Sequence, residues 1–358
     1  MQGRLTINLK HLKENYQLLK KIASPAAVAS VVKADAYGLG AKNIAPALYD
    51  AGCRFFFVAT LDEALNLRQT IDKNSQIAVL QENLYKQENA FIKNDLLPVL
   101  NSRKDIEIWH AFCKKEQKKY SALIHIDTGM HRLGLEKEDI KWLTQKTEIF
   151  ETISIPYLMS HLAHSELEDD RNEKQRQTLE KFIQCLPKIP ISFANSGGIF
   201  LGPCFHYQQV RPGIALYGMD PRPQSLTKIK PVVTLEAPIL QIKKLEENQE
   251  IGYSGTFTTK RQTAIAAVAL GYADGWPRLL SNKGHAYYKG YKLPIRGKIS
   301  MDSLILDITD SPILPKVGDF IEFIGPHQSL QQIAQDAQTI GYEILTNLGC
   351  RLKRYYTQ

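Results

Sequence analysis

The stretch Ala29-Ser30-Val31-Val32-Lys33-Ala34-Asp35-Ala36-Tyr37-Gly38-Leu39-Gly40 is an apolar, β-branched run that ends in one lysine and then breaks into glycines. This pattern predicts a buried strand that delivers an amine into a site. Burial at the end of a parallel strand lowers a lysine pKa, and an unprotonated amine can form a Schiff base with a carbonyl. A lysine that only extends past the strand end into solvent is the alternative, and this stretch alone does not decide between the two. The pair Gly38-x-Gly40 lacks the third glycine of a dinucleotide-binding loop, because Asn43 occupies that position.

Length and composition limit the class of protein. A chain of 358 residues with 44% hydrophobic content suits a globular enzyme with one large and one smaller domain. The first 25 residues contain no continuous apolar segment, so we expect a cytoplasmic protein without a membrane span. Five scattered cysteines without C-x-x-C spacing predict reduced thiols. The net charge of +8 raises a nucleic-acid hypothesis, but the basic run 114–119 has no interleaved aromatics, so we expect no nucleic-acid partner.

Strand-like runs alternate with amphipathic helical segments from residue 26 onward. The alternation predicts eight strands, at 28–32, 55–58, 77–80, 96–100, 122–126, 153–159, 191–194 and 208–210. Eight strand–helix units fit a closed parallel barrel better than an open sheet, so we predict an α/β fold with an N-terminal (β/α)8 TIM-type barrel.

The pattern changes after Tyr217. Prolines at 221, 223 and 231 mark a link, and β-rich runs follow at 232–245, 263–270, 292–295, 303–308 and 320–324. Two short helical patterns, 330–337 and 341–348, precede a last strand-like segment at 351–356. We therefore predict a mostly β C-terminal domain at 229–358 after a barrel at 9–228.

Polar residues follow the predicted barrel strands where each one ends. In a (β/α)8 barrel the chemistry lies at the carboxyl ends of the strands. Five of the eight runs are followed by candidate residues: Lys33 and Tyr37, residues 127–132, His161, Asn195 with Ser196, and residues 211–213. A cap, a turn or a surface charge could explain each alone, but those readings do not explain their joint placement.

Several motifs resemble those of alanine racemases, in the same order along the chain. They are Val32-Lys33-Ala34-Asp35-Ala36-Tyr37-Gly38, Asp127-Thr128-Gly129-Met130-His131-Arg132-Leu133-Gly134, Ser160-His161-Leu162-Ala163, Ala194-Asn195-Ser196, Val210-Arg211-Pro212-Gly213-Ile214, Leu270-Gly271-Tyr272-Ala273-Asp274-Gly275 and Gly297-Lys298-Ile299-Ser300-Met301-Asp302. The resemblance covers nearly the whole chain. It implies the cofactor pyridoxal 5'-phosphate (PLP), a β domain joined by the N-terminal strand 1–8, and a homodimer with shared active sites.

The resemblance also implies roles for the residues at the strand ends. Lys33 would carry the cofactor and act as one catalytic base, while Arg211 would face the pyridine nitrogen in place of a carboxylate and keep that nitrogen unprotonated. His161 would support Arg211, and Arg132 would contact the cofactor's phenolic oxygen and the substrate carboxylate. The implied phosphate-binding and neighbouring cofactor residues are Tyr37, Asn195, Ser196, Gly213 and Ile214. An ion pair is the structural alternative for Arg211, and a helix N-cap is the alternative for Ser196, although capping and phosphate binding can hold together.

Three residues of the β domain complete the implied site. Tyr253 resembles the second catalytic base, supplied by the other subunit, because racemisation needs a proton acceptor and a donor on opposite faces of Cα. Met301 resembles a backbone donor to the substrate carboxylate, and Tyr272 resembles a gate residue, with simple aromatic packing as its alternative. The spacing His161-x-x-His164-x-Glu166 lacks a further ligand cluster, so we expect no metal.

Two positions depart from the family pattern. His125 stands where the family commonly has a carbamylated lysine, so we expect an anion or a rearranged carboxylate beside Arg132 instead. Cys350 replaces a tyrosine that contacts the phosphate in many members.

The sequence thus predicts racemisation of L- and D-alanine by Lys33 and Tyr253, supplying D-alanine for peptidoglycan. Two alternatives are a racemase of broader specificity, for serine or lysine, and a PLP-binding homeostasis protein without turnover. The β domain and Tyr253 count against the second, because such proteins resemble the barrel alone.

Overall fold

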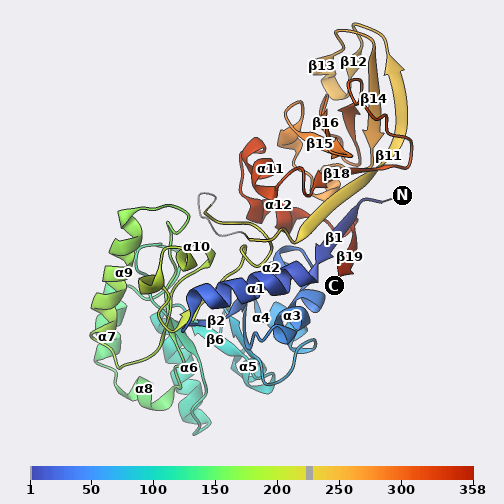
Figure 1. Cartoon of the computed structure of the whole chain (residues 1–358). Coiled ribbons are helices and arrows are strands. Elements are labelled where there is room, and N and C mark those ends of the chain that lie inside the picture. The colour runs from blue at the N-terminus through green and yellow to red at the C-terminus, as the bar shows by residue number, and fades with distance from the viewer. Residues whose placement is uncertain (1, 223–228) are drawn as a thin grey trace.

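The protein consists of a barrel and a smaller, mostly β domain (Figure 1). The structure is a computed structural model and describes residues 2–222 and 229–358. The predicted domain boundary at residues 228 and 229 falls at the edge of the segment 223–228, outside the described residues, and it stays a prediction.

The barrel is built from parallel strands that pair in chain order. They are β2 (Ala27–Val28), β3 (Ser30–Val31), β4 (Phe55–Val58), β5 (Gln76–Val79), β6 (Leu97–Leu100), β7 (Leu123–His125), β8 (Leu158–Met159), β9 (Ile191–Ser192) and β10 (Gln209–Val210). β2 pairs with β10 and β3 pairs with β4, while only Ala29 separates β2 from β3. The first predicted strand therefore closes the barrel as two short halves, and the predicted barrel class is confirmed.

Helices between the strands cover the outside of the barrel, as the alternation predicted (Figure 1). They are α1 (Leu9–Ala23), α3 (Ala41–Asp50), α4 (Leu61–Arg68), α5 (Glu88–Lys93), α6 (Arg103–Lys115), α7 (Lys137–Thr144), α8 (Glu148–Thr152), α9 (Asp170–Ile183) and α10 (Ser196–Ile199). Asn8 caps α1, since its side chain accepts a hydrogen bond from the His11 backbone N–H at 2.9 Å. Thr60 and Ser102 cap α4 and α6 in the same way.

The second domain is a sheet that also contains the first and last strands of the chain. Its strands are β1 (Arg4–Asn8), β11 (Val233–Leu245), β14 (Thr263–Val268), β15 (His285–Tyr288), β16 (Tyr291–Pro294), β17 (Leu304–Asp307), β18 (Phe320–Ile324) and β19 (Lys353–Thr357), with the separate pair β12 (Glu250–Ile251) and β13 (Phe257–Thr258). β1 pairs with β11 and with β19. Both chain ends thus tie this sheet to helix α1 of the barrel.

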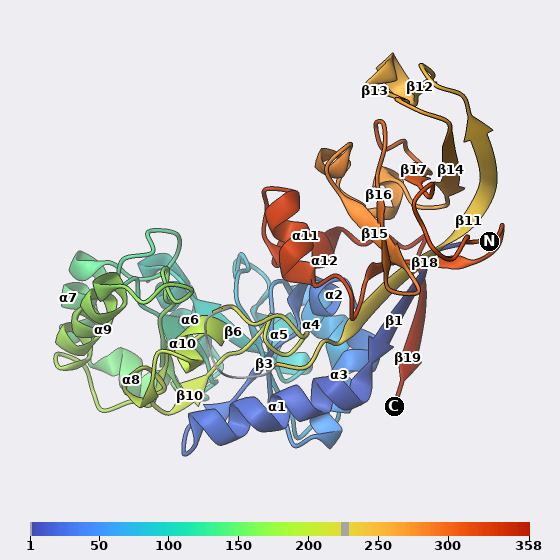
Figure 2. The same cartoon turned by 45° about the horizontal axis from the view of Figure 1, so that its top comes forward.

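Two short helices of the second domain face the barrel (Figure 2). They are α11 (Leu330–Asp336) and α12 (Gly341–Asn347), and α12 packs against the turn that follows β3. This places residues of the second domain beside the carboxyl end of the first barrel strand.

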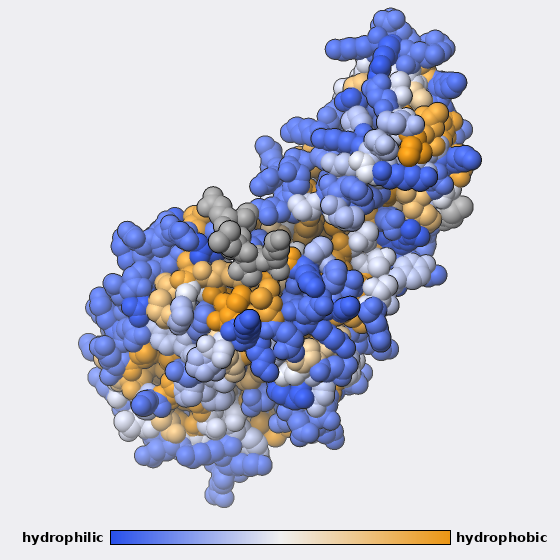
Figure 3. Space-filling model, in the orientation of Figure 1, coloured by the Kyte–Doolittle hydropathy of each residue, from blue (hydrophilic) through white to orange (hydrophobic). Residues whose placement is uncertain are grey.

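The surface is mainly hydrophilic on the face drawn in Figure 3, where hydrophobic residues are exposed in separate patches on both domains. Among the residues that the structure describes, no helix has the length and apolar content needed to cross a membrane.

Candidate active site

Lys33 begins a turn of unusual hand, α2 (Lys33–Tyr37). The next four residues, Ala34 to Tyr37, have φ values of 52°, 52°, 55° and 58°, so the chain makes one left-handed helical turn without a glycine. Left-handed backbone costs an L residue roughly 1–2 kcal/mol. Such a turn persists only where its surroundings hold it in place, and clusters of such residues mark functional sites.

Contacts from three elements hold this turn. At its start, Oε1 of Glu63 in α4 accepts a hydrogen bond from the Ala34 N–H at 2.7 Å. At its end, Gly38 has a φ of 80°, and its carbonyl accepts two bonds from the guanidinium of Arg354 in β19, at 3.1 and 2.8 Å. A Cβ on Gly38 would lie 2.5 Å from the Leu345 carbonyl of α12, so no other residue fits. Lys33 is therefore held by both domains.

A cavity of about 690 Å³ opens where the barrel strands end. Its lining includes every barrel residue that the sequence singled out for the cofactor, namely Lys33, Tyr37, Arg132, His161, Asn195, Ser196, Arg211, Gly213 and Ile214. Ile340, Tyr342, Glu343 and Thr346 of the second domain also line it. Joint placement at the strand ends thus brought the barrel candidates together.

The Lys33 amine lies in a setting that favours its neutral form. Burial lowers the pKa of Lys33, the charge of Arg132 lowers it further, and the Glu63 carboxylate opposes this change. The pKa of Lys33 is therefore lowered, which is the direction that the sequence predicted. Within the described residues the amine makes no hydrogen bond and no ion pair.

Hydroxyl and backbone N–H groups gather at one side of the cavity. Ser196 Oγ accepts bonds from the backbone N–H of Gly213 at 2.9 Å and of Ala215 at 3.3 Å. A Cβ on Gly213 would lie 2.2 Å from Oη of Tyr37, so glycine is required where this hydroxyl approaches the backbone. The N-cap of α10 is Asn195, which accepts from the Gly198 N–H at 3.0 Å, so the N-cap alternative for Ser196 is wrong.

Arg211 is buried and surrounded by neutral acceptors. Its Nη1 donates to Ser192 Oγ at 2.8 Å, and its Nη2 donates to the Ser160 carbonyl at 2.6 Å. Within the described residues no carboxylate pairs with it, so the ion-pair alternative is wrong. Burial lowers the pKa of Arg211 to about 10, which keeps it charged at neutral pH. The Arg211 Nε makes no hydrogen bond in the part of the chain that the structure describes, so its N–H can donate to a ligand in the cavity.

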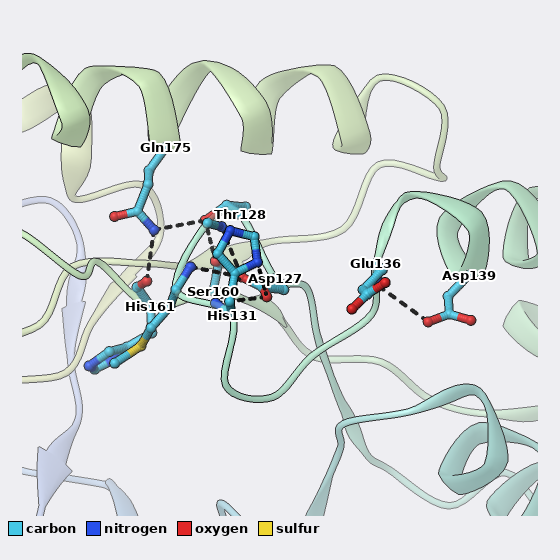
Figure 4. A network of polar contacts seen from close by, with 10 residues as sticks. Asp127, Thr128, His131, Glu136, Asp139, Ser160, His161 and Gln175 are labelled. Carbon is cyan, nitrogen blue, oxygen red and sulfur yellow. Dashed lines mark hydrogen bonds and ion pairs between the residues drawn. The ribbon is translucent and has the colours of Figure 1, made fainter.

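His161 contacts Arg211, as predicted. Its Nδ1 lies 3.3 Å from Nη2 of Arg211. Burial and the charge of Arg211 hold the pKa of His161 well below its usual value, so the ring is neutral. Gln175 of α9 donates to the His161 carbonyl at 3.2 Å and to Thr128 at 3.4 Å, which joins the loops after β7 and β8 (Figure 4).

His125 is a neutral, fixed side chain at the end of β7. The amide of Asn101 is oriented by the carbonyls of Leu80 and Val99, to which its Nδ2 donates at 2.9 and 3.1 Å. Its Oδ1 therefore accepts from Nδ1–H of His125 at 2.8 Å. Burial, aided by nearby arginines, lowers the pKa of His125 to about 4. Arg132 shares the cavity, and in the described ranges no carboxylate forms an ion pair with it.

The candidates of the second domain lie outside this cavity and form a second group. Tyr253, Tyr272 and Met301 are 66%, 43% and 53% exposed. The Tyr272 N–H donates to the Ser300 carbonyl at 3.1 Å, and Lys298 Nζ donates to Ser254 Oγ at 3.1 Å, so one network of loops carries all three. Within one chain, therefore, Tyr253, Tyr272 and Met301 lie outside the cavity that contains Lys33. Cys350 is exposed and does not line the cavity.

Sequence reasoning missed Glu63 and Tyr342. Both line the cavity, and the Tyr342 ring lies 6.1 Å from that of Tyr37. The sequence does contain a signal for Glu63, because this residue follows the predicted strand 55–58 just as the other candidates follow their strands. The described residues contain no group of three or more histidine, cysteine or acidic side chains placed to hold a metal.

The fold is that of a barrel enzyme, and its cavity contains a lysine amine, hydroxyl and backbone N–H groups, and a buried arginine. The comparisons identify the family. The profile described as "Alanine racemase, N-terminal domain" matches residues 7–221, and that described as "Alanine racemase, C-terminal domain" matches residues 232–356. The chain belongs to the alanine racemase family.

Known relatives resemble the chain over its whole length. It is 45% identical to a catabolic alanine racemase of Agrobacterium fabrum, over 99% of this chain and 92% of that one. An alanine racemase of Brucella canis is 42% identical over 99% of this chain and 93% of its own. The crystal structure of alanine racemase from Bartonella henselae, with covalently bound pyridoxal phosphate, is 46% identical, covers 100% of both chains and superimposes with a TM-score of 0.97.

Proposed function

We propose that the chain is a PLP-dependent enzyme that interconverts L- and D-alanine in the cytoplasm and supplies D-alanine for peptidoglycan. The observation that carries the proposal is the Lys33 amine, which is held at the end of the barrel in a setting that lowers its pKa. Family membership and the bound pyridoxal phosphate of the Bartonella henselae relative support it.

The cavity fits PLP at both ends. The hydroxyls of Tyr37 and Ser196 and the N–H of Ile214 would hold the phosphate, and the Gly213 N–H would be shared between the phosphate and Ser196 Oγ, since glycine lets the backbone approach a dianion closely. The free Nε of Arg211 would donate to the pyridine nitrogen. With a pKa of about 10, Arg211 keeps its proton, so that nitrogen stays unprotonated. When bound, PLP withdraws electrons from the substrate Cα and makes its hydrogen acidic.

Two bases on opposite faces of Cα complete the chemistry. Lys33, once the incoming amino acid has displaced it from the cofactor, would remove or return the proton on one face. Tyr253 of the partner subunit would act on the other face. Its 66% exposure in one chain supports this, because a catalytic tyrosine that serves its own chain would line the cavity. Arg132, together with the backbone of Met301 of the partner subunit, would bind the substrate carboxylate.

Two measurements test the proposal. The purified holoenzyme is reduced with borohydride and digested, and mass spectrometry then locates the reduced cofactor, which we expect on Lys33. D-Alanine formation is assayed in parallel, with serine and lysine as competing substrates. A label on any other lysine, or turnover of serine or lysine faster than that of alanine, would contradict the proposal.

A further inference from the structure

Glu63 joins the backbone that carries Lys33 to the neighbouring barrel strand. Its Oε1 accepts from the Ala34 N–H and its Oε2 from the Ala59 N–H, both at 2.7 Å. Ala34 starts the left-handed turn directly after Lys33, and Ala59 directly follows β4. One carboxylate therefore links the ends of two adjacent strands, and both of its oxygens are used in strong, charge-assisted bonds.

Glu63 and Lys33 also line the same cavity, and the Glu63 carboxylate acts electrostatically on the Lys33 amine. The charged groups that act on Lys33 are Glu63, Arg132 and Arg211, and Glu63 is the negative one among them. His161, which lines the same cavity, is neutral. Glu63 thus forms a hydrogen bond to the turn and carries a negative charge that opposes the effect of the two arginines on the pKa of Lys33.

We propose that Glu63 is a positioning residue that holds the left-handed turn in the geometry in which Lys33 reaches the cofactor and supplies a negative charge that opposes the effect of Arg132 and Arg211 on Lys33. This inference deepens the proposed function and rests on the assigned role of Lys33. Glu63 acts through the backbone and through its charge, without touching the reacting atoms.

The rest of the turn is held independently, so substitution of Glu63 need not unfold it. Arg354 of β19 donates to the Gly38 carbonyl at 2.8 Å, and Tyr356 donates to the Leu39 carbonyl at 2.9 Å. Asp35 accepts from the Ala41 N–H at 2.7 Å. These bonds remain in a Glu63 variant and keep the second half of the turn in place.

Glu82 provides a matched control. It follows β5 and its carboxylate also bridges two backbone N–H groups, those of Leu61 at 2.9 Å and Asn83 at 3.1 Å. Unlike Glu63, it does not line the cavity. The variants Glu63→Gln and Glu82→Gln therefore remove the same charge and the same kind of contact, but only the first does so beside Lys33.

The first readout uses the apoenzyme and no turnover. Lys33 is acylated with an amine-reactive reagent across a range of pH, and peptide mass spectrometry follows its rate of modification. Removing the negative charge disfavours the ammonium form, so in Glu63→Gln the half-maximal rate should occur at a lower pH than in the wild type and in Glu82→Gln. Glu63→Asp keeps the charge and should restore most of the wild-type profile.

The second readout is PLP affinity, measured by titrating the apoenzyme with PLP and following tyrosine and tryptophan fluorescence. An amide can accept from only one of the two N–H groups, and the shorter aspartate cannot reach both. Both Glu63 variants should therefore bind PLP about tenfold more weakly, while Glu82→Gln should bind like the wild type.

The outcomes separate this inference from the proposed function. If borohydride labels Lys33 in the wild type, but Glu63→Gln matches Glu82→Gln in both readouts, the inference is wrong and the proposed function stands. If the label lies on another lysine in the wild type, the proposed function itself fails.

Discussion

Nη2 of Arg211 donates to Nδ1 of His161 across 3.3 Å, which fixes the tautomer of the histidine ring. An arginine cannot accept a hydrogen bond, so Nδ1 carries the lone pair and Nε2 carries the proton. His161 is neutral and Arg211 keeps its charge, so neither residue gives up a proton at neutral pH to an acceptor in the cavity.

Arg211→Glu should therefore change the outcome of the reaction. A carboxylate can hold a proton on the pyridine nitrogen, and the cofactor then becomes a stronger electron sink that gives the substrate carbanion a longer lifetime. We expect more pyruvate per racemised alanine, measured by coupling pyruvate to lactate dehydrogenase beside a D-alanine assay. An unchanged ratio in a folded variant with bound PLP would show that this role of Arg211 is wrong.

Lys33→Ala should remove the covalent link to the cofactor and lower racemisation by at least the roughly 10²–10⁴-fold typical of a lost general base. The fold should persist, because the Lys33 side chain makes no hydrogen bond within the described residues and alanine fits at a strand end. Absorption spectroscopy measures the loss of the covalent link to the cofactor, and circular dichroism measures whether the fold persists. Full activity with a normal cofactor spectrum would exclude Lys33 as the attachment site.

The space beside Arg132 should hold an anion. Arg132 lacks a carboxylate partner in the described residues, and the fixed, neutral His125 cannot supply a negative charge. Anomalous scattering from crystals grown in bromide should show the halide there, and activity should depend on halide and not on bicarbonate. A bare Arg132 in such crystals, with activity independent of halide, would count against this expectation.

His125 should make the protein less stable in acid. The unfolded imidazole has a pKa of about 6.5, whereas burial lowers the folded value to about 4. Between these values the unfolded chain binds the proton and the folded chain does not, so stability falls as the pH falls. At pH 5 the loss relative to pH 8 amounts to about 2 kcal/mol from this group.

His125→Gln is the matched variant, because its amide can still donate to Asn101. Urea unfolding of the wild type and the variant at pH 8 and pH 5 measures the difference. The gap between the two proteins should change by about 2 kcal/mol in favour of the variant at pH 5. An equal pH dependence would mean that His125 takes up its proton in the folded state near the ordinary pH.

The barrel and its site followed from sequence periodicity, because short apolar runs alternate with helical segments and five of the eight runs are followed by polar candidate residues. Lys33, His161 and Arg211 were found in this way, and the structure places them in one cavity. The family resemblance supplied the predictions that periodicity could not, namely the cofactor, a dimer and a catalytic role for Tyr253.

The left-handed turn at Ala34 to Tyr37 could not be predicted, since neither alanine nor tyrosine favours positive φ. Its conformation depends on contacts with Glu63 and Arg354, which lie far away in the sequence. The hairpin of β15 and β16 was only partly predicted, although Lys289 and Gly290 form a turn with φ values of 49° and 85°. Tertiary contacts determine the left-handed turn, whereas the hairpin has a local turn signal that the sequence interpretation did not use.

The central claim is that Lys33 of one subunit and Tyr253 of the other share each active site. Lys33→Ala and Tyr253→Phe should each lower racemisation by roughly 10²–10⁴-fold as homodimers. In a mixed dimer one active site contains both substitutions, while the other contains the native Lys33 of one subunit and the native Tyr253 of its partner.

The decisive measurement is racemase activity after the two variants have been unfolded together and refolded with PLP, with the mixed dimer quantified by native mass spectrometry. The shared-site account predicts that activity returns, at one working site per mixed dimer. If mixed dimers form and no activity returns, Tyr253 serves its own chain or takes no part in proton transfer, and the account is contradicted.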